Sequence, residues 1–343
     1  MYWDFLAVFV LSFFFIFLVK KYASKMGLID IPNERSTHQE HTPRGAGIGF
    51  FLAIAVISPC FYFNLCLSYM WTLIAIFLIF IIGVLDDHHD TSPNTKFIII
   101  ILATVFLSFD GIIISDIGTF FGLSLTLGWF ALPFTIFAVV GFTNALNLID
   151  GLDGLSASIS IVILGTFYVI GHQNSDLFML ILSGSFIAGL LAFLFFNWYP
   201  ASIFMGDSGS LTLGFIIAIL AILSLKYIHP IAALYFTTLP IYDTFTVIIR
   251  RVRKRVPIFQ PDQTHIHHLL MKYIGDRDEE GKRTGTRRTV SILVFLQFLF
   301  TFTGLQVNHL LAIGYDIALL ALLVFLLGIL GVYYITIEIE KVE

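Results

Sequence analysis

Charged residues are scarce in this chain of 343 residues. Asp, Glu, Lys and Arg make up 12% of it, about half the share of an ordinary soluble domain, whereas apolar residues make up 58%. Long polar segments are also missing, and the longest one covers 250–288. No segment is large enough to fold alone as a soluble domain. We therefore treat residues 1–343 as one integral membrane domain.

Cysteine is almost absent, and the sequence also lacks the features of a cleavable signal peptide and of an internal repeat. Cys60 and Cys66 form no CxxC motif and have no metal-ligand spacing, which argues against a cysteine metal centre. Lys20 and Lys21 follow the first apolar run instead of preceding it, so we expect a retained first span and no cleavable signal peptide. The missing internal repeat argues against a transporter built from inverted repeats.

Long apolar runs are what the sequence has in abundance. A helix needs about 20 apolar residues to cross the hydrocarbon core of a membrane. The stretch 110–128 is rich in glycine and β-branched residues, which favours a hairpin or re-entrant piece on the outer face. The sequence predicts an all-α polytopic membrane protein with about 11 transmembrane helices, at 3–19, 46–63, 67–85, 97–109, 129–147, 155–171, 176–196, 209–225, 230–249, 289–308 and 311–336.

Lys and Arg are distributed very unevenly between the two sides of these spans. With the N-terminus outside, 18 of 19 fall in cytoplasmic loops or the C-terminal tail, and only Lys226 lies outside. Cytoplasmic loops carry such an excess of positive charge. We therefore expect a periplasmic N-terminus, a cytoplasmic C-terminus and a long basic cytoplasmic loop at 250–288. Within that loop, THIHHLLMKYIG predicts a short amphipathic helix at the membrane surface.

The first candidate site motif is the pair Asp86 and Asp87, at the inner end of the third apolar run. Adjacent carboxylates disfavour each other's ionisation unless a cation lies between them. Mg²⁺ is a hard ion that prefers oxygen ligands. A solvated helix end is the alternative, but acidic residues there oppose the helix dipole. The pair therefore favours a site for a metal and phosphate.

The second motif joins the fifth and sixth apolar runs and contains Asn144, Asn147, Asp150 and Asp153. The two asparagines are three residues apart and so share a helix face. The glycines after Asp150 and Asp153 allow a tight turn and close approach of the backbone to a ligand. Asp153 has an alternative role as the N-cap of the following helix.

The third motif is FMGDSGS at 204–210, which opens the eighth apolar run. Free backbone N–H groups at a helix start can bind an anion, and Asp207 can bind the metal that accompanies it. The alternative is that Asp207 or Ser208 merely caps the helix.

The fourth motif consists of His265, His267 and His268 in the basic loop. Imidazoles can ligate a transition metal, or they can hydrogen-bond phosphate and transfer protons. We favour binding of phosphate or sugar, because the cysteines lie on the other face.

Two isolated charges leave alternatives open. Lys96 either contacts a phosphate or extends to the interface from a helix end. Asp243 lies inside the ninth run, where a charge is costly, and either pairs with Arg250 or supports the site. All four motifs fall in cytoplasmic loops or at inner ends of spans, so a compact bundle would bring them to a cleft open to the cytosol and the inner leaflet.

In this order the motifs resemble the polyprenyl-phosphate N-acetylhexosamine-1-phosphate transferases, a family of the glycosyltransferase 4 type. The resemblance extends from about residue 20 to residue 275 and rests on TPRGAGIG, Asp86-Asp87, NALNLIDGLDGL, FMGDSGS and PDQTHIHHLL. Within the family, the sequence is most similar to the bacterial undecaprenyl-phosphate N-acetylglucosamine-1-phosphate transferases. The two features that indicate this group are the isoleucine after the first histidine and the predicted eleven spans.

The resemblance implies a membrane enzyme that starts a cell-surface glycan such as O-antigen, common antigen or teichoic acid. It would transfer an N-acetylhexosamine-1-phosphate, with N-acetylglucosamine expected, from a UDP-sugar to undecaprenyl phosphate and release UMP. It would use Mg²⁺, with Mn²⁺ as a substitute, at the cytoplasmic face of the bacterial inner membrane. Nucleic acid is not an expected partner, and a homodimer is left open.

The same resemblance assigns roles to residues of the four motifs. Direct displacement is expected, although a two-step route through a phosphorylated aspartate stays open. The implied metal ligands are Asp87, Asp207 and Asn147; the implied catalytic residues are Asp86, Asp87, Asp150 and Asp153; the implied substrate-binding residues are Asn144, Asn147, Lys96, His265, His267 and His268.

Three other function classes fit part of this pattern. A secondary transporter would place its ionisable residues near the membrane midplane, whereas most of these lie at one rim. A membrane prenyltransferase is suggested by Asp86-Asp87-x-x-Asp90, but a second such motif is missing and the histidines would have no role. A non-catalytic scaffold does not need clustered acidic residues.

Overall fold

The computed structural model describes residues 2–31, 41–257, 264–275 and 279–342. Arg35 and the parts of the predicted basic loop at 258–263 and 276–278 lie outside the described residues. The elements along the chain are α1 (Tyr2–Tyr22), β1 (Ile29–Asp30), β2 (Thr42–Pro43), α2 (Ala46–Ser68), α3 (Met70–His89), α4 (Pro93–Phe109), β3 (Asp116–Phe120), β4 (Leu123–Thr126), η1 (Gly128–Phe130), α5 (Ala131–Ile149), α6 (Leu155–Gln173), α7 (Leu177–Asn197), α8 (Asp207–Ser224), α9 (Pro230–Phe236), α10 (Thr238–Lys254), α11 (Ile266–Ile274), α12 (Glu279–Ala312) and α13 (Ala318–Val342).

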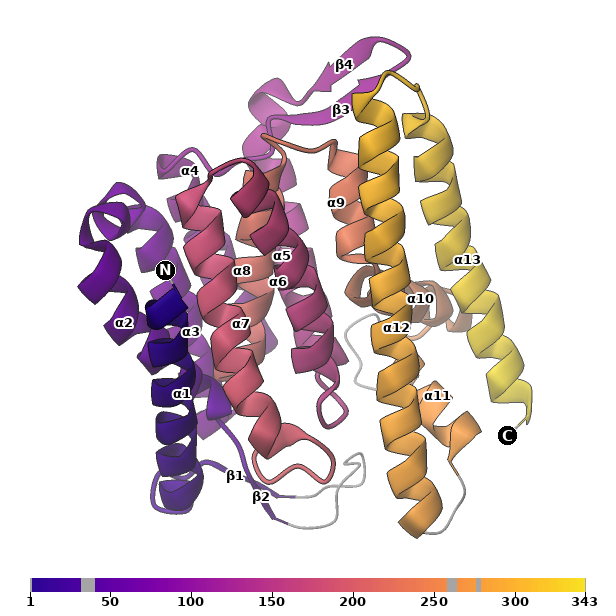
Figure 1. The fold of residues 1–343 in the computed structure, drawn as a ribbon. Coiled ribbons are helices and arrows are strands. Elements are labelled where there is room, and N and C mark those ends of the chain that lie inside the picture. Colours follow the sequence, from indigo (N-terminus) through magenta and orange to yellow (C-terminus); the bar gives the residue numbers. More distant parts are fainter. Residues whose placement is uncertain (1, 32–40, 258–263, 276–278, 343) are drawn as a thin grey trace.

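The helices stand side by side as a bundle (Figure 1). Within the described part of the chain, nine helices are long and apolar enough to cross a membrane, and ten spans result if α9 and α10 form one broken span. Helix α4 is apolar but has only 17 residues. These findings confirm an all-α polytopic membrane protein, whereas the number of eleven spans and their orientation stay predictions.

Short strand pairs lie at opposite ends of the bundle (Figure 1). Strands β3 and β4 pair antiparallel, so the hairpin alternative for 110–128 is confirmed. Strand β1 pairs antiparallel with β2 at the other end, which joins the end of α1 to the start of α2.

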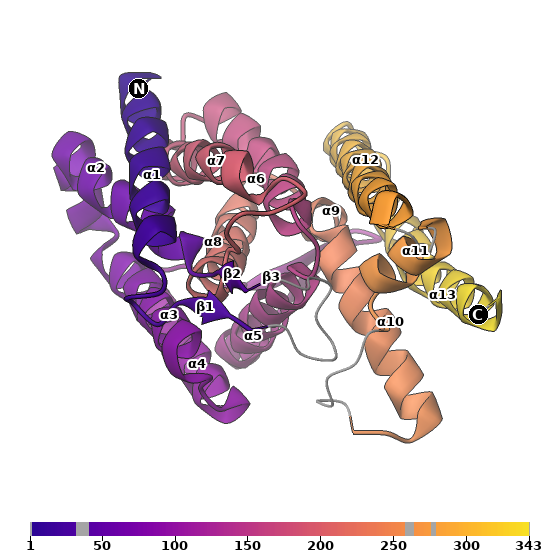
Figure 2. The ribbon, with the colours of Figure 1, turned by 90° about the horizontal axis from the view of Figure 1, so that it is seen from below.

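Helix α8 lies at the centre of the bundle, and 89% of its residues are buried. Figure 2 shows α8 among α3, α5, α6 and α7, all of which it contacts. A Cβ atom at Gly83 of α3 would lie 2.5 Å from the carbonyl oxygen of Asp207. Only glycine therefore lets α3 pack this closely on the start of α8, as small residues do at membrane helix contacts. This contact brings the end of α3 beside the start of α8.

The ninth predicted span is not one straight helix. Helices α9 and α10 are bent by 81° at Thr237, because Pro240 has no N–H to donate to the carbonyl of Phe236 four residues earlier. Gln297 of α12 replaces the missing bond: its Nε2 donates to Phe236 O at 2.8 Å, and its Oε1 accepts from Leu239 N at 3.2 Å. Inside a membrane such backbone groups must be satisfied within the protein. The apolar run predicted at 230–249 therefore folds as two helices joined by a sharp bend.

The bend directs α10 away from the bundle axis, as Figure 2 shows. Further along the chain, α11 is the short helix predicted within THIHHLLMKYIG, and it packs on α12 and α13. This helix prediction is confirmed, and its position at a membrane surface stays a prediction.

Candidate active site

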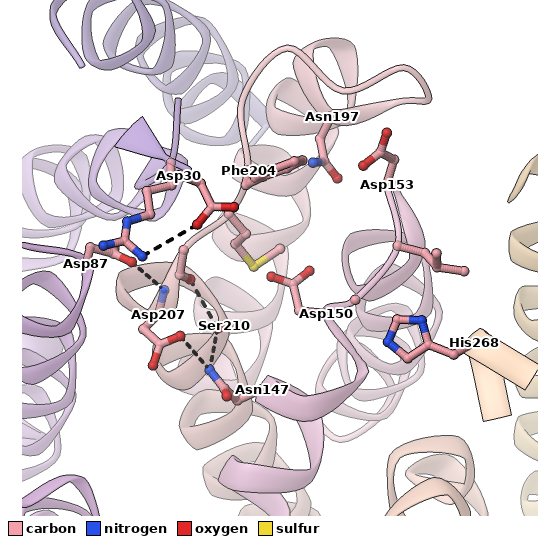
Figure 3. Close-up of a pocket in the computed structure, with 15 residues that line it drawn as sticks. Asp30, Asp87, Asn147, Asp150, Asp153, Asn197, Phe204, Asp207, Ser210 and His268 are labelled. Carbon is pink, nitrogen blue, oxygen red and sulfur yellow. Dashed lines mark hydrogen bonds and ion pairs between the residues drawn. The ribbon is translucent and has the colours of Figure 1, made fainter. Parts of the chain in front are cut away.

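Acidic side chains line a cavity of about 310 Å³ at the end of the bundle where α3, α5 and α7 finish and α8 begins. We call it the acidic cavity. In the view of Figure 3, Asp150 lies between Asp207 and His268. All four sequence motifs contribute to this lining, so their predicted convergence is confirmed. The lining consists of Asp30, Arg44, Asp87, Asn147, Asp150, Gly151, Leu152, Asp153, Asn197, Phe204, Met205, Gly206, Asp207, Ser210 and His268.

Asp87 caps the N-terminus of α8. Its Oδ1 accepts a hydrogen bond from Asp207 N at 2.8 Å, and its Oδ2 accepts one from Ser208 N at 3.1 Å. The first N–H groups of a helix have no helical partner and carry the positive end of its dipole. Gly206 has φ +74°, and a Cβ there would lie 2.6 Å from both carboxylate oxygens. The cap of α8 thus comes from α3 and not from Asp207 or Ser208.

Lys96 lies between two carboxylates. Its Nζ is 2.8 Å from Asp86 Oδ2 and 2.5 Å from Asp207 Oδ2. Asp86 Oδ1 also accepts hydrogen bonds from the N–H and hydroxyl of Thr91, at 2.8 and 2.7 Å. Consecutive helical residues point about 100° apart, so Asp86 faces Lys96 whereas Asp87 faces α8. Of these two aspartates only Asp87 lines the acidic cavity, and Lys96 does not line it either.

Asn147 links α5 to α8. Its Nδ2 donates to Asp207 Oδ1 at 3.0 Å and to Ser210 Oγ at 2.9 Å. Asn144 instead donates back to the carbonyl of Val140 at 2.8 Å and stays outside the cavity lining. The structure therefore places Asn147, but not Asn144, beside Asp207 in the cavity.

Asp153 ties the turn between α5 and α6 to the segment that follows α7. Its Oδ2 accepts from Ala201 N at 2.8 Å. Asn197 Oδ1 accepts from Gly154 N at 2.8 Å, and Gly154 is the N-cap of α6. The alternative reading of Asp153 as that N-cap is therefore wrong.

Asp150 follows the last residue of α5 and carries an altered proton affinity. Burial, and then the negative charges of Asp207, Asp153 and Asp87, raise the pKa of Asp150 well above its ordinary value. Both effects disfavour the charged form of a carboxyl group. A carboxyl group with a raised pKa holds its proton at a higher pH than an ordinary aspartate, which suits it to exchange a proton with a substrate.

The three histidines have different surroundings. His268 lines the acidic cavity. His267 is 1% exposed, and its two ring nitrogens have no hydrogen-bond partner among the described residues. Burial lowers the pKa of His267 to about 3, so its ring is neutral at physiological pH. His265 lies outside the cavity lining, and its Nδ1 is 2.7 Å from Asp243 Oδ2.

Several lining residues were not among the predicted site residues. Arg44 approaches Asp30 at 3.8 Å and Asp90 at 3.5 Å, and the pairing of β1 with β2 brings it to the cavity. Arg44 belongs to TPRGAGIG, so a sequence signal was available for it. Asp30 and Asn197 belong to none of the four motifs, and their place depends on how the loops meet.

The donor chemistry of the lining fits a divalent cation. Among the described residues, no group of three His, Cys, Asp or Glu side chains is already arranged around one point as a metal centre. The lining is nevertheless strongly acidic, and Mg²⁺ prefers carboxylate and amide oxygens. Arg44 is the one Lys or Arg in this lining, against five carboxylates: Asp30, Asp87, Asp150, Asp153 and Asp207.

An acid-lined cavity at one end of a membrane bundle is suited to bind a divalent cation, and through that cation charged phosphates, at the membrane boundary. The chain belongs to the family described as glycosyl transferase family 4, whose pattern matches residues 69–225. The match runs from α3 to α8 and contains the Asp86-Asp87 pair and Asp207.

Individual relatives narrow the comparison. A protein of Bacillus subtilis (strain 168) described as a probable undecaprenyl-phosphate N-acetylglucosaminyl 1-phosphate transferase is 34% identical over 295 residues, which cover 84% of this chain and 79% of the relative. The undecaprenyl-phosphate alpha-N-acetylglucosaminyl 1-phosphate transferase of Escherichia coli (strain K12) is 33% identical over a stretch that covers 78% of this chain and 76% of the relative. The enzyme of that description from Yersinia pestis is 31% identical over a stretch that covers 77% of this chain and 75% of the relative.

Proposed function

We propose that this protein transfers N-acetylglucosamine-1-phosphate from UDP-N-acetylglucosamine to undecaprenyl phosphate and releases UMP, the first step of a cell-surface glycan. The observation that carries the proposal is the acidic cavity, in which Asp87, Asp150 and Asp207 from three segments meet at one end of a membrane bundle. The descriptions of the relatives name undecaprenyl phosphate and the N-acetylglucosaminyl 1-phosphate group, which supports the acceptor and the transferred group.

The reaction is a displacement at phosphorus. An oxygen of the lipid phosphate attacks the phosphorus that carries the sugar, and the bond from that phosphorus to the UMP oxygen breaks with its electron pair. Two anions must meet, so catalysis depends on positioning and on neutralising charge. A diphosphate-linked lipid and UMP are the two products, in equal amounts.

The side chains around the cavity suggest a division of roles. Asp87, Asp207 and Asn147 would hold Mg²⁺, or Mn²⁺ in its place, and a bound ion neutralises diphosphate charge. Lys96 holds Asp86 and Asp207 together through its two ion pairs. Asp150, with its raised pKa, is our candidate for exchanging a proton with the lipid phosphate.

The remaining residues of the cavity would bind the donor. Asp153 is fixed to Ala201 and would position the nucleotide. His268, which lines the cavity, would contact the diphosphate or the sugar, since an imidazole can donate a hydrogen bond to phosphate oxygen. His267 packs on Gly151 behind this lining and would support the turn that holds Asp150. We place this site at the cytoplasmic face of the bacterial inner membrane, where a soluble donor and a lipid acceptor can both reach it.

The test is a reconstituted reaction. Purified protein is mixed with undecaprenyl phosphate, labelled UDP-N-acetylglucosamine and Mg²⁺, and lipid-linked product and UMP are both measured. We expect equal amounts of both, loss of both with a chelator, and recovery with Mg²⁺ or Mn²⁺. Other UDP-N-acetylhexosamines tested in parallel identify the preferred sugar. Absence of product with every one of these donors contradicts the proposal.

A further inference from the structure

The first histidine of the HIHH segment is held by an aspartate outside the acidic cavity. His265 Nδ1 lies 2.7 Å from Asp243 Oδ2, and Asp243 Oδ1 accepts the N–H of Ile266 at 2.7 Å. Asp243 is 1% exposed and His265 is 5% exposed. An ionised carboxylate only accepts hydrogen bonds, so the proton of this contact is on His265 Nδ1.

This carboxylate also fixes the start of α11. Ile266 is the first residue of α11, and its N–H has no partner within the helix. His265 is the N-cap but makes no capping bond with its own side chain. Asp243 of α10 supplies the missing acceptor, and its negative charge complements the helix dipole. The position at which α11 begins is therefore set by a residue of another helix.

Helix α11 carries the other two histidines toward the cavity. A Cβ atom at Gly151 would overlap the ring of His267, so α11 packs directly on the turn that holds Asp150. His268 follows, with its ring 4.2 Å from that of His267, and lines the cavity. A shift at the start of α11 would move both rings relative to this turn.

We infer that Asp243 and His265 form a positioning pair for the transfer reaction. His265 acts by fixing α11 through Asp243, without touching substrate, and His268, which lines the cavity, makes the contact with the donor. The inference rests on the proposed function and differs from the expectation that all three histidines bind substrate.

Two substitutions of His265 distinguish a positioning role, in which Nδ1 contacts Asp243, from a binding role, in which Nε2 contacts substrate. The amide of Asn places an N–H near the position of imidazole Nδ1, whereas the longer amide of Gln places one near Nε2. We expect His265→Asn to retain most of the kcat/KM for UDP-N-acetylglucosamine, and His265→Gln to lose about 10- to 100-fold, as for partners that orient a ligand. The reverse order would mean that Nε2 touches substrate and would overturn the inference.

A double-mutant cycle tests whether the two residues act as one unit. Asp243→Ala and His265→Ala should each raise the KM for the UDP-sugar more than the KM for undecaprenyl phosphate. The double variant should be no worse than either single variant, because coupled residues are not additive. Losses that multiply, or an unchanged donor KM, contradict the pairing. Asp243→Asn replaces Asp243→Ala if the latter gives no folded protein.

The chain offers a matched control for removing a buried carboxylate. Asp4 of α1 is 2% exposed and accepts a hydrogen bond from the hydroxyl of Tyr62. Neither residue lines the acidic cavity. Asp4→Asn should lower the melting temperature and leave both KM values unchanged. If Asp4→Asn raises the donor KM as Asp243→Ala does, the effect is general destabilisation and the inference fails.

A readout without catalysis keeps this inference separate from the proposed function. Amide hydrogen exchange over 266–274 should be faster in Asp243→Ala and His265→Gln than in the wild type, and unchanged in His265→Asn. An inactive wild type with this exchange pattern refutes the proposed function and leaves the pair standing. Equal exchange in all four proteins refutes the pair whatever the activity.

Discussion

Asp86 and Asp87 are neighbours in the chain and have different partners in the fold. Asp87 caps α8 and lines the acidic cavity, whereas Asp86 bonds Thr91 and shares Lys96 with Asp207. The pair therefore contributes one side chain to the cavity and one to the ion pairs beside it. At the residue scale, the environment of each carboxylate decides its chemistry.

Replacing Asp87 by Asn should greatly impair catalysis. The amide removes a negative charge from the proposed metal site, so we expect kcat to fall by more than the ~100-fold typical of groups that only orient a ligand. The amide oxygen can accept one of the two helix N–H bonds, and the lost cap should lower stability by about 1 kcal/mol. Both are measured on purified protein by kinetics and thermal melting.

Asp90→Asn is the control for this substitution. It removes the same charge from a side chain that is 87% exposed and three residues further along the chain. It should keep nearly full activity. Equal activity of wild type, Asp87→Asn and Asp90→Asn would refute the assignment of Asp87 to the site.

His267 should make the stability of the protein depend on pH. Its pKa is about 3 in the folded protein against an ordinary value of 6.5. Between these values the unfolded chain binds a proton that the folded chain does not, so stability falls as the pH falls below about 6.5. The melting temperature of His267→Gln should therefore drop less than that of the wild type between neutral pH and about pH 5.

The exposed His172 provides the comparison for this measurement. His172→Gln should show the same drop in melting temperature on acidification as the wild type. If His267→Gln and His172→Gln respond alike, burial of His267 does not cause the pH dependence.

At the scale of elements, two devices shape the site. Gly83 lets α3 approach α8, which places Asp87 on the N–H groups that it caps. Pro240 breaks the ninth span, and Gln297 of α12 satisfies the backbone at the break. The resulting bend of 81° directs α10, so that Asp243 reaches the start of α11.

Gln297→Leu should destabilise the break between α9 and α10. The substitution leaves Phe236 O and Leu239 N without their partner, and each unsatisfied buried group costs about 1–3 kcal/mol. We expect a lower melting temperature in detergent. Gln306→Leu changes an exposed residue of the same helix and should leave the melting temperature nearly unchanged. Equal melting temperatures for both variants would show that Gln297 does not stabilise the break.

At the scale of the whole molecule, the acidic cavity and the β3–β4 hairpin lie at opposite ends of the bundle. The uneven distribution of Lys and Arg predicts that the end with the cavity faces the cytoplasm. The hairpin would then face the periplasm. In this orientation the cavity of the proposed enzyme would be open to a soluble donor in the cytosol.

Single cysteines can test the orientation. In a background with Ser at positions 60 and 66, Asn94→Cys marks the end near the cavity, and Ser124→Cys marks the hairpin. Both positions are exposed. In intact spheroplasts a membrane-impermeant thiol reagent should label only Ser124→Cys, and in permeabilised cells it should label both. Labelling of Asn94→Cys in intact spheroplasts would reverse the orientation.

The sequence by itself determined the protein class and most members of the site. Apolar runs specify membrane helices because a backbone in lipid must satisfy its own hydrogen bonds. All eleven runs fold as helices, although the second is kinked at Tyr62 and the ninth is broken at Thr237. Asp87, Asn147, Asp150, Asp153, Asp207 and His268 were predicted from local patterns, and all of them line the cavity.

Only the tertiary structure decided how these residues divide their roles. It separated Asp86 from Asp87, left Asn144 and Lys96 outside the cavity lining, and brought Asp30 and Arg44 into it. It also joined Asp243 to His265, which are 22 positions apart in the chain. Such contacts depend on where helix ends meet, and that is set by close packing and bends between segments remote in sequence, which a local pattern of residue types does not encode.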